Sequence, residues 1–245
     1  MHYVLILLTA FGLAAPLRPP KPVGPATKPV VVLELFTSQG CSSCPPADKA
    51  LQEITQQAAK SGQAIYGLSF HVDYWNRLGW QDPFSTKQYT DRQRQYDRNL
   101  NTQTYTPQLV INGRQNVIGG QRKRIEQAIQ TIQKQPVSSF IGVDGSLVRN
   151  ARQVTINYAL SAAGPYRVNV ALVQKEAQTV VKNGENGGRT LLNTNVVRQF
   201  RTIDNSDASG NVTLLLPDGL TADQTAVLVY VQRKDDGQIV GAKQF

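Results

Sequence analysis

The chain has 245 residues, of which 40% are hydrophobic, and a formal net charge of +9. This composition supports one large folded domain or two modest ones, and it excludes a wholly disordered chain. The two cysteines, Cys41 and Cys44, exclude a framework of long-range disulfides. A bridge between them would close only a very short ring, which constrains the unfolded chain little.

Residues 1–15 are typical of a secretory signal. An apolar run ends in small residues, although no lysine or arginine precedes it. The run is too short to cross a bilayer, but it suits the apolar stretch of an export signal. We therefore predict a periplasmic or secreted protein with no transmembrane span beyond this segment. Residues 16–29 contain several prolines and predict an extended tether.

Residues 30–136 predict an α/β domain. The apolar, β-branched run at 30–36 indicates a strand buried on both faces. Pro45 and Pro46 suit the first turn of a helix that extends to residue 60. The later elements are predicted as a strand at 64–70, a helix at 85–100, a strand at 108–111, a hairpin turn at Asn112-Gly113, a strand at 116–118 and a helix at 121–134.

Beyond Pro136 the hydrophobic period changes to two residues, which predicts an all-β antiparallel sandwich over residues 137–245. Its strands are predicted at 154–158, 168–172, 212–216, 227–231 and 239–245. The glycine-rich stretch at 183–188 is interpreted as a loop, because it lacks the preceding strand and following helix of a phosphate-binding loop.

The basic residues are scattered along the chain. They recur in two predicted helices, as Arg92, Arg94 and Arg98 in one and at 122–124 in the other. A patch for an acidic partner is one interpretation, and a solvated helix face is the one that we favour. No basic motif is interleaved with aromatic residues, so no nucleic-acid partner is predicted.

The spacing of the cysteines predicts redox chemistry. A strand, a turn and a helix surround them, and we expect Cys41 where the helix begins and Cys44 one turn further in. Free N–H groups and the helix dipole at that end favour a thiolate, which is the reactive form of cysteine. Cys41 would then attack a partner disulfide, and Cys44 would resolve the mixed disulfide.

Polar residues after the second predicted strand are candidates for the same edge of the sheet. His71, Asp73 and Trp75 would emerge beside Cys41, because parallel strands end on the same side. They are interpreted either as tuning or partner-binding residues, or as residues that pin a long loop. Glu34, within the first strand, requires a partner or a raised pKa.

A metal site is an alternative use of the cysteines. Cys41, Cys44, His71 and Asp73 would supply four ligands. A lone Cys-x-x-Cys in an exported chain favours redox chemistry over zinc, so we predict neither a metal nor a cofactor.

Residues 30–134 resemble the thioredoxin superfamily. The resemblance rests on the strand, Cys-x-x-Cys and helix, on Thr106-Pro107 before a hairpin, and on a glycine pair before the last helix. It implies that Pro107 is cis and faces the cysteines, and that Thr106, with Ser42 and Ser43 of the spacer, contacts the partner. It also implies a buried acid as a proton relay, for which Glu34 is the nearest counterpart, one residue farther from the cysteines.

More narrowly, the chain resembles a bacterial exported family catalogued as domain of unknown function 1223. The similar segments are residues 34–48, 71–75, 78–80, 105–107 and 195–198, so the resemblance covers almost the whole mature chain. It supports the fold and export, but it assigns no substrate.

Two functional hypotheses follow. The first is an exported thiol–disulfide oxidoreductase that acts on protein thiols or disulfides of the cell envelope. The second is a non-enzymatic binding or redox-sensing module whose disulfide is structural.

Overall fold

The computed structural model describes residues 23–245 except 151 and 206. The predicted signal and residues 16–22 of the tether lie outside these residues. Residues 23–29 contain neither helix nor strand. No helix in the described ranges is both long and apolar enough to cross a membrane.

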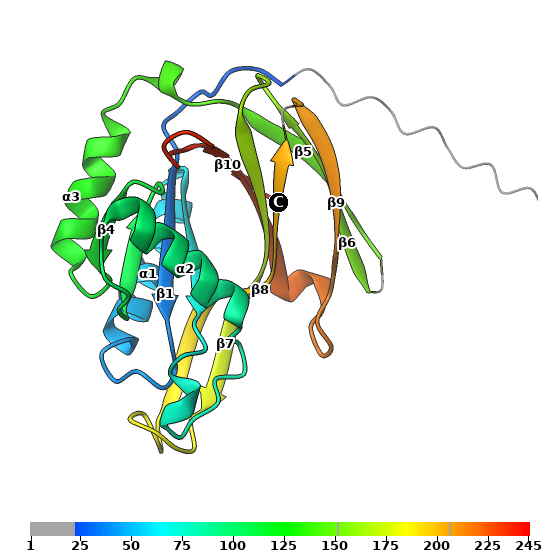
Figure 1. The fold of residues 1–245 in the computed structure, drawn as a ribbon. Helices are drawn as coiled ribbons and strands as arrows, with labels where there is room; N and C mark the ends of the chain where they lie inside the picture. Colours follow the sequence, from blue (N-terminus) through cyan, green and yellow to red (C-terminus); the bar gives the residue numbers. More distant parts are fainter. Residues whose placement is uncertain (1–22, 151, 206) are drawn as a thin grey trace, which may run out of the picture.

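The main sheet has eight strands, and it runs through both halves of the chain in the order β11-β10-β7-β8-β2-β1-β3-β4 (Figure 1). In the first half, β1 pairs in parallel with β2 and antiparallel with β3, which pairs with β4. The bounds of these strands are β1 Val31–Thr37, β2 Ile65–His71, β3 Gln108–Ile111 and β4 Gln115–Ile118. They match the predicted strands to within one residue at each end.

The helices cover both faces of this half of the sheet. They are α1 (Pro45–Lys60), α2 (Lys87–Leu100) and α3 (Arg122–Gln133), with single 3-10 turns at Asn76–Leu78, Val137–Ser139 and Ala222–Gln224. Glu34 of β1 bonds to α2, whereas the next residue, Leu35, lies beside the first turn of α1. Since neighbouring strand residues point to opposite faces, α1 and α2 lie on opposite sides of the sheet.

The β-rich half forms part of the same sheet. Its strands β7 (Tyr166–Val180), β8 (Thr190–Asn205), β10 (Thr225–Arg233) and β11 (Ile239–Gln244) extend the sheet, and β8 pairs in parallel with β2 at Val196 and Ser69. Only β5 (Val143–Arg149), β6 (Gln153–Leu160) and β9 (Ser209–Leu215) form a separate three-stranded antiparallel sheet. The sandwich prediction is therefore correct in that two sheets pack together in this half. It is wrong in that one of them, formed by β7, β8, β10 and β11, continues the α/β sheet.

Two hydrophobic cores result, and β10 contributes to both. Its residues Val227, Val229 and Val231 pack toward the three-stranded sheet. The alternate residues Leu228 and Tyr230 join the core of the α/β half. Successive residues of β10 therefore point into different cores. Both faces of the strand are buried, because a sheet or a helix covers each side.

The turn between β3 and β4 forms as predicted at Asn112-Gly113. Both residues have positive φ angles, 45° and 70°, which the tight hairpin turn requires. The Asn112 side chain also ties the turn to β1, since it accepts a hydrogen bond from the Val32 N–H and donates one to the Val30 carbonyl. A Cβ at Gly113 would overlap the carbonyl of Gly237, so the close approach of two loops also requires glycine here.

Candidate redox site

The two cysteines form a disulfide at the start of α1. Their Cα atoms lie 5.4 Å apart, and both residues are completely buried. Cys44 is the N-cap of α1, and Cys41 lies in the turn that precedes it. The prediction placed both residues about one turn further along the helix. The shift arises because Pro45 and Pro46 occupy the first turn, which leaves Cys44 as the residue before it.

The peptide bond between Thr106 and Pro107 is cis, as the resemblance implies. Pro107 is buried next to the first turn of α1, since both it and Ala47 flank Gly119. Trp75 connects this segment to the cysteine loop. Its indole N–H donates to Thr106 Oγ1 at 2.8 Å, and its Cβ lies beside Gly40. Trp75 and Thr106 therefore lie at the edge of the disulfide loop.

Asp48 is a buried carboxyl one turn after Cys44, and the sequence analysis missed it. Its backbone N–H donates to the Cys44 carbonyl, and the residue is 7% exposed. Burial raises the pKa of Asp48 to about 7, against a smaller opposing effect of His71. Its spacing of four residues from Cys44 places both on one helix face, which is the signal that could have identified it.

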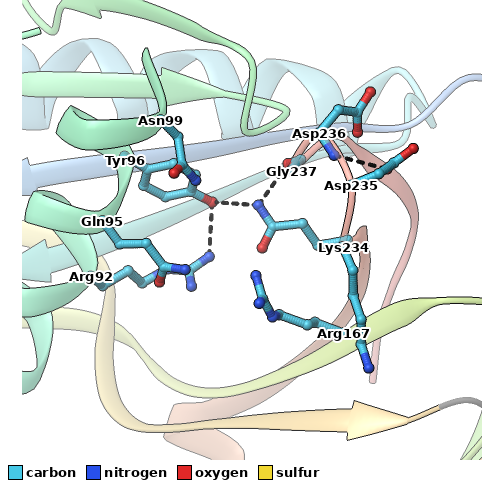
Figure 2. A pocket seen from close by; sticks show the side chains of 10 residues that line it. Arg92, Gln95, Tyr96, Asn99, Arg167, Lys234, Asp235, Asp236 and Gly237 are labelled. Carbon is cyan, nitrogen blue, oxygen red and sulfur yellow. Dashed lines mark hydrogen bonds between the residues drawn. The ribbon is translucent and has the colours of Figure 1, made fainter. Parts of the chain in front are cut away.

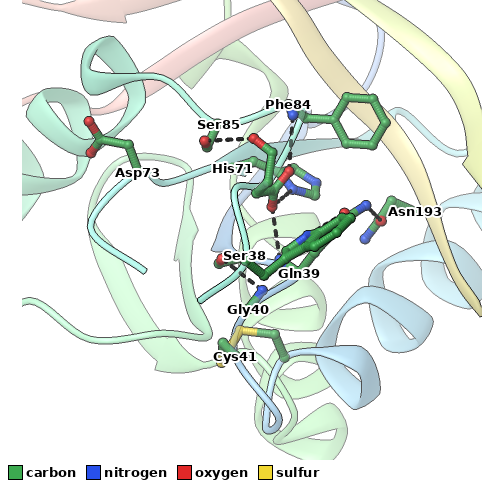
Figure 3. Close-up of polar contacts among 12 residues, drawn as sticks. Ser38, Gln39, Gly40, Cys41, His71, Asp73, Phe84, Ser85 and Asn193 are labelled. Carbon is green, nitrogen blue, oxygen red and sulfur yellow. Dashed lines mark hydrogen bonds and ion pairs between the residues drawn. A yellow bond between two sulfur atoms is a disulfide. The ribbon is translucent and has the colours of Figure 1, made fainter. Parts of the chain in front are cut away.

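His71 and Asp82 form a second buried pair beside this carboxyl. Nδ1 of His71 lies 2.7 Å from Asp82 Oδ2, and the same carboxylate accepts the Gln39 N–H, which supports the loop before Cys41 (Figure 3). Burial opposes protonation of His71, but the Asp82 carboxylate outweighs it and raises the pKa of His71. The pKa of Asp82 is lowered against its own burial, chiefly by His71.

Three buried polar atoms around Asp48 have no hydrogen-bond partner among the described residues. They are Asp48 Oδ1, Thr37 Oγ1 and His71 Nε2. Buried polar atoms are normally paired, and both Thr37 and His71 are close enough to lower the pKa of Asp48, although burial outweighs them. The cluster lies on the strand ends and the helix that carry the disulfide.

Glu34 has a complete set of partners away from this cluster. It accepts hydrogen bonds from Arg92 Nε and Nη2, at 2.9 and 2.7 Å, and from the hydroxyls of Tyr96 and Tyr230. It also lies on the α2 face of the sheet, opposite α1. The predicted relay through Glu34 therefore has no geometric support, whereas Asp48 lies on the helix that Cys44 caps.

Arg92 differs from its interpretation as part of a solvated helix face. Its side chain is 9% exposed, and its guanidinium packs over the ring of Phe200 at 4.6 Å. Figure 2 shows it beside Tyr96 on the wall of a polar cavity that Arg167 and Lys234 also line. The sequence pattern could not reveal that Arg92 is buried, because the carboxylate that pairs with it, Glu34, lies on β1 and not on α2.

Asp73 lies away from the disulfide. It accepts a hydrogen bond from Thr90 Oγ1 at 2.6 Å, and Figure 3 shows it at the upper left of the view, with Cys41 near the bottom. His71 bonds to Asp82 and not to Asp73. Within residues 23–245, apart from the two gaps, no three His, Cys, Asp or Glu side chains are grouped to hold a metal ion.

The tip of the β7–β8 hairpin completes the site from the β-rich half of the chain. Asn186 is fully buried and donates 2.9 Å hydrogen bonds to the carbonyls of Gln39 and Cys41. Glu185 accepts the N–H of Ser42 at 2.9 Å. The loop prediction for residues 183–188 was therefore correct, but its contact with the cysteines had no signal in the sequence.

A mixed sheet, a Cys-x-x-Cys disulfide at a helix start and a neighbouring cis proline define a thioredoxin-like protein. Residues 32–232 match the family described as protein of unknown function (DUF1223), so the chain belongs to that family. A crystal structure of protein AGR_C_4864 from Agrobacterium tumefaciens is similar, with 32% identity, a TM-score of 0.68, and coverage of 90% of this chain and 96% of that one.

HBP35 of Porphyromonas gingivalis shares the fold at 16% identity and a TM-score of 0.61, over 91% of this chain and 76% of that one. No curated protein matches the sequence.

Proposed function

We propose that the protein is an exported thiol–disulfide oxidoreductase that acts on protein thiols or disulfides of the cell envelope. The observation that carries the proposal is the disulfide at the start of α1, with Asp48 on the helix that Cys44 caps. A bridge this short contributes little to stability, so reversible chemistry is the better explanation for it. The location outside the cytoplasm rests on the sequence of residues 1–15.

The reaction has two exchange steps. The Cys41 thiolate attacks one sulfur of a partner disulfide, forms a mixed disulfide and releases one partner thiolate. Cys44 then gives its proton to Asp48 and attacks Cys41 Sγ. The Cys41–Cys44 bond closes, the second partner thiolate leaves, and two electrons have passed from the pair to the partner. The reverse sequence oxidises a partner dithiol.

The residues around the disulfide take separate roles in this scheme. Thr106 and Trp75 lie at the loop edge, and Ser42 and Ser43 are exposed, so these residues contact the partner. His71 and Asp82 hold the loop through Gln39 and adjust the charge beside Asp48.

Trapping of the mixed disulfide tests the proposal. Reduced Cys44→Ser protein, incubated with insulin, is expected to accumulate a covalent adduct through Cys41, because no second thiol is present to resolve it. Wild-type protein should reduce insulin without accumulating the adduct. Intact-mass spectrometry measures both. The double variant, Cys41→Ser with Cys44→Ser, is the control and should form none.

The complete burial of both cysteines favours a second candidate, a binding or redox-sensing module with a structural disulfide. The same experiment separates the two. If the reduced Cys44→Ser protein forms no adduct with insulin, and wild-type protein neither reduces insulin nor exchanges with glutathione, the oxidoreductase proposal is wrong and the second candidate stands.

A further inference from the structure

The β7–β8 hairpin fixes a carboxylate beside the attacking cysteine. Asn186 is completely buried under the cysteine loop and bonds to it twice, and Arg189 holds the Asn186 side-chain oxygen at 2.7 Å. Gly184, at the same tip, also packs against Trp80 of the neighbouring loop. The position of the adjacent Glu185 is thus set by a buried anchor, although its own side chain is exposed.

Glu185 bonds to the backbone amide that follows the attacking cysteine. Its Oε2 accepts the N–H of Ser42, the amide that directly follows Cys41. This hydrogen bond lowers the pKa of Glu185, so the carboxylate is charged at neutral pH. A thiolate is stabilised by free N–H groups and destabilised by a nearby like charge. A charged Glu185 bonded to this amide is therefore a like charge next to Cys41, and it takes up one N–H of the cysteine loop.

The hairpin contributes this carboxylate from a part of the chain far from the cysteines in sequence, and the thioredoxin-like segment alone does not contain it. The other charged or titratable groups around the loop are Arg189 on the hairpin, Asp48 on α1, His71 on β2 and Asp82 in the following loop. Of these groups, Glu185 alone bonds to the spacer between the cysteines.

We propose that Glu185 determines the reactivity and specificity of the site. It lowers the fraction of Cys41 that is present as thiolate, and it favours partners with a cationic side chain beside their reactive cysteine. A positive charge on the partner neutralises the carboxylate and frees the Ser42 N–H as the mixed disulfide forms. A partner with an acidic residue there meets like-charge repulsion. This inference deepens the proposed function and rests on it for the nature of the partner.

The first test measures Cys41 without any protein partner. In a Cys44→Ser background, the rate of alkylation by iodoacetamide is followed against pH, alone and with Glu185→Gln added. We expect Glu185→Gln to raise the rate roughly threefold to tenfold below neutral pH, as loss of a like charge near the thiol requires. Because Glu185 is exposed, the difference should shrink in high salt.

Glu176→Gln is the matched control, since Glu176 is exposed on the same hairpin and the substitution changes the net charge equally. It should leave the rate unchanged. An equal rate for Glu185→Gln and its parent, or a difference that salt does not reduce, would overturn the proposed effect on the thiolate. This outcome is independent of the insulin experiment, because iodoacetamide needs only the free thiol.

The second test addresses specificity. Reduced protein is mixed with two peptide disulfides that differ only in a lysine or an aspartate beside the cysteine, and the two exchange rates are compared. Wild type should prefer the lysine peptide, and Glu185→Gln should lose most of that preference, whereas Glu176→Gln should keep it. The same preference in all three proteins would refute a role in specificity.

Discussion

Replacement of Asp48 by asparagine is expected to make the oxidised protein more stable at alkaline pH. The pKa of Asp48 is raised to about 7 in the folded protein from 3.8, so the folded state binds its proton more tightly than the unfolded state does. A group whose pKa is raised by folding stabilises the folded state fully at pH values below its unfolded pKa. This contribution is lost as the pH rises through its folded pKa. From these pKa values, the loss between about pH 4 and about pH 8 is on the order of 4 kcal/mol.

Urea unfolding of both oxidised proteins across this pH range measures the effect. The difference between Asp48→Asn and wild type should grow in favour of the variant from about pH 4 to about pH 7, and it should level off above pH 7. Asp91→Asn, at an exposed position on α2, is the control and should show no such trend. A constant difference across the range would mean that Asp48 does not carry the raised pKa.

The same variant separates a proton relay from a purely structural role. If Asp48 accepts the proton of Cys44, the rate at which a mixed disulfide is resolved should rise through pH 7 in wild type. Asp48→Asn should lose this rise and resolve the adduct roughly a hundredfold more slowly. Stopped-flow release of a chromogenic thiol from Cys41 measures the step.

Replacement of Glu34 by leucine is expected to destabilise the fold strongly. The change leaves the buried Arg92 guanidinium without its carboxylate and removes the acceptor of two tyrosine hydroxyls. Loss of one partner of a buried ion pair costs about 3 to 5 kcal/mol, because the remaining charge stays desolvated. Urea unfolding of the oxidised protein should show a loss of this size.

A double-mutant cycle provides the control for this pair. Glu34→Leu combined with Arg92→Met removes both charges and should cost less than Glu34→Leu alone. Asp91→Asn, which breaks the exposed pair with Lys87, should change the free energy of unfolding by less than about 1 kcal/mol. If the double variant lost as much stability as the sum of the two single variants, the pair would not be coupled.

The α/β half was predictable because its signals are local. The apolar run of β1, the two prolines that open α1 and the Asn112-Gly113 turn each fix one element through nearby residues. The order of these elements then limited the topology and placed the cysteines near the start of α1, although about one turn too far along the helix. The place of Pro107 was implied by the resemblance to the thioredoxin superfamily.

The β-rich half was less predictable because two strands break the expected pattern. Strand β8, Thr190–Asn205, has polar residues at its centre, and its pairing with β7 shifts by one residue near Val173. Asn195 there has a φ angle of 50°, which interrupts regular alternation. Strand β5, Val143–Arg149, is mostly exposed and has little apolar signal. Since β8 joins the two halves, its absence from the prediction hid the continuous sheet.

The candidate site likewise has residues that local sequence predicts and residues that it does not. Cys41 and Cys44 were recognisable from spacing, and Asp48 lay within reach of the same helical reasoning. Asn186 and Glu185 reach the cysteines only through the β7–β8 hairpin, about 140 residues away in sequence, and no local pattern encodes that contact.

The reduction potential of the Cys41–Cys44 pair tests the central claim most directly. Oxidised protein is equilibrated in a series of thiol–disulfide buffers, and the fraction of free thiol is measured by alkylation and mass spectrometry. We expect half-reduction between about −270 and about −120 mV, the range of exchanging pairs. A pair that stays oxidised below about −300 mV would behave as a structural disulfide and would contradict the account.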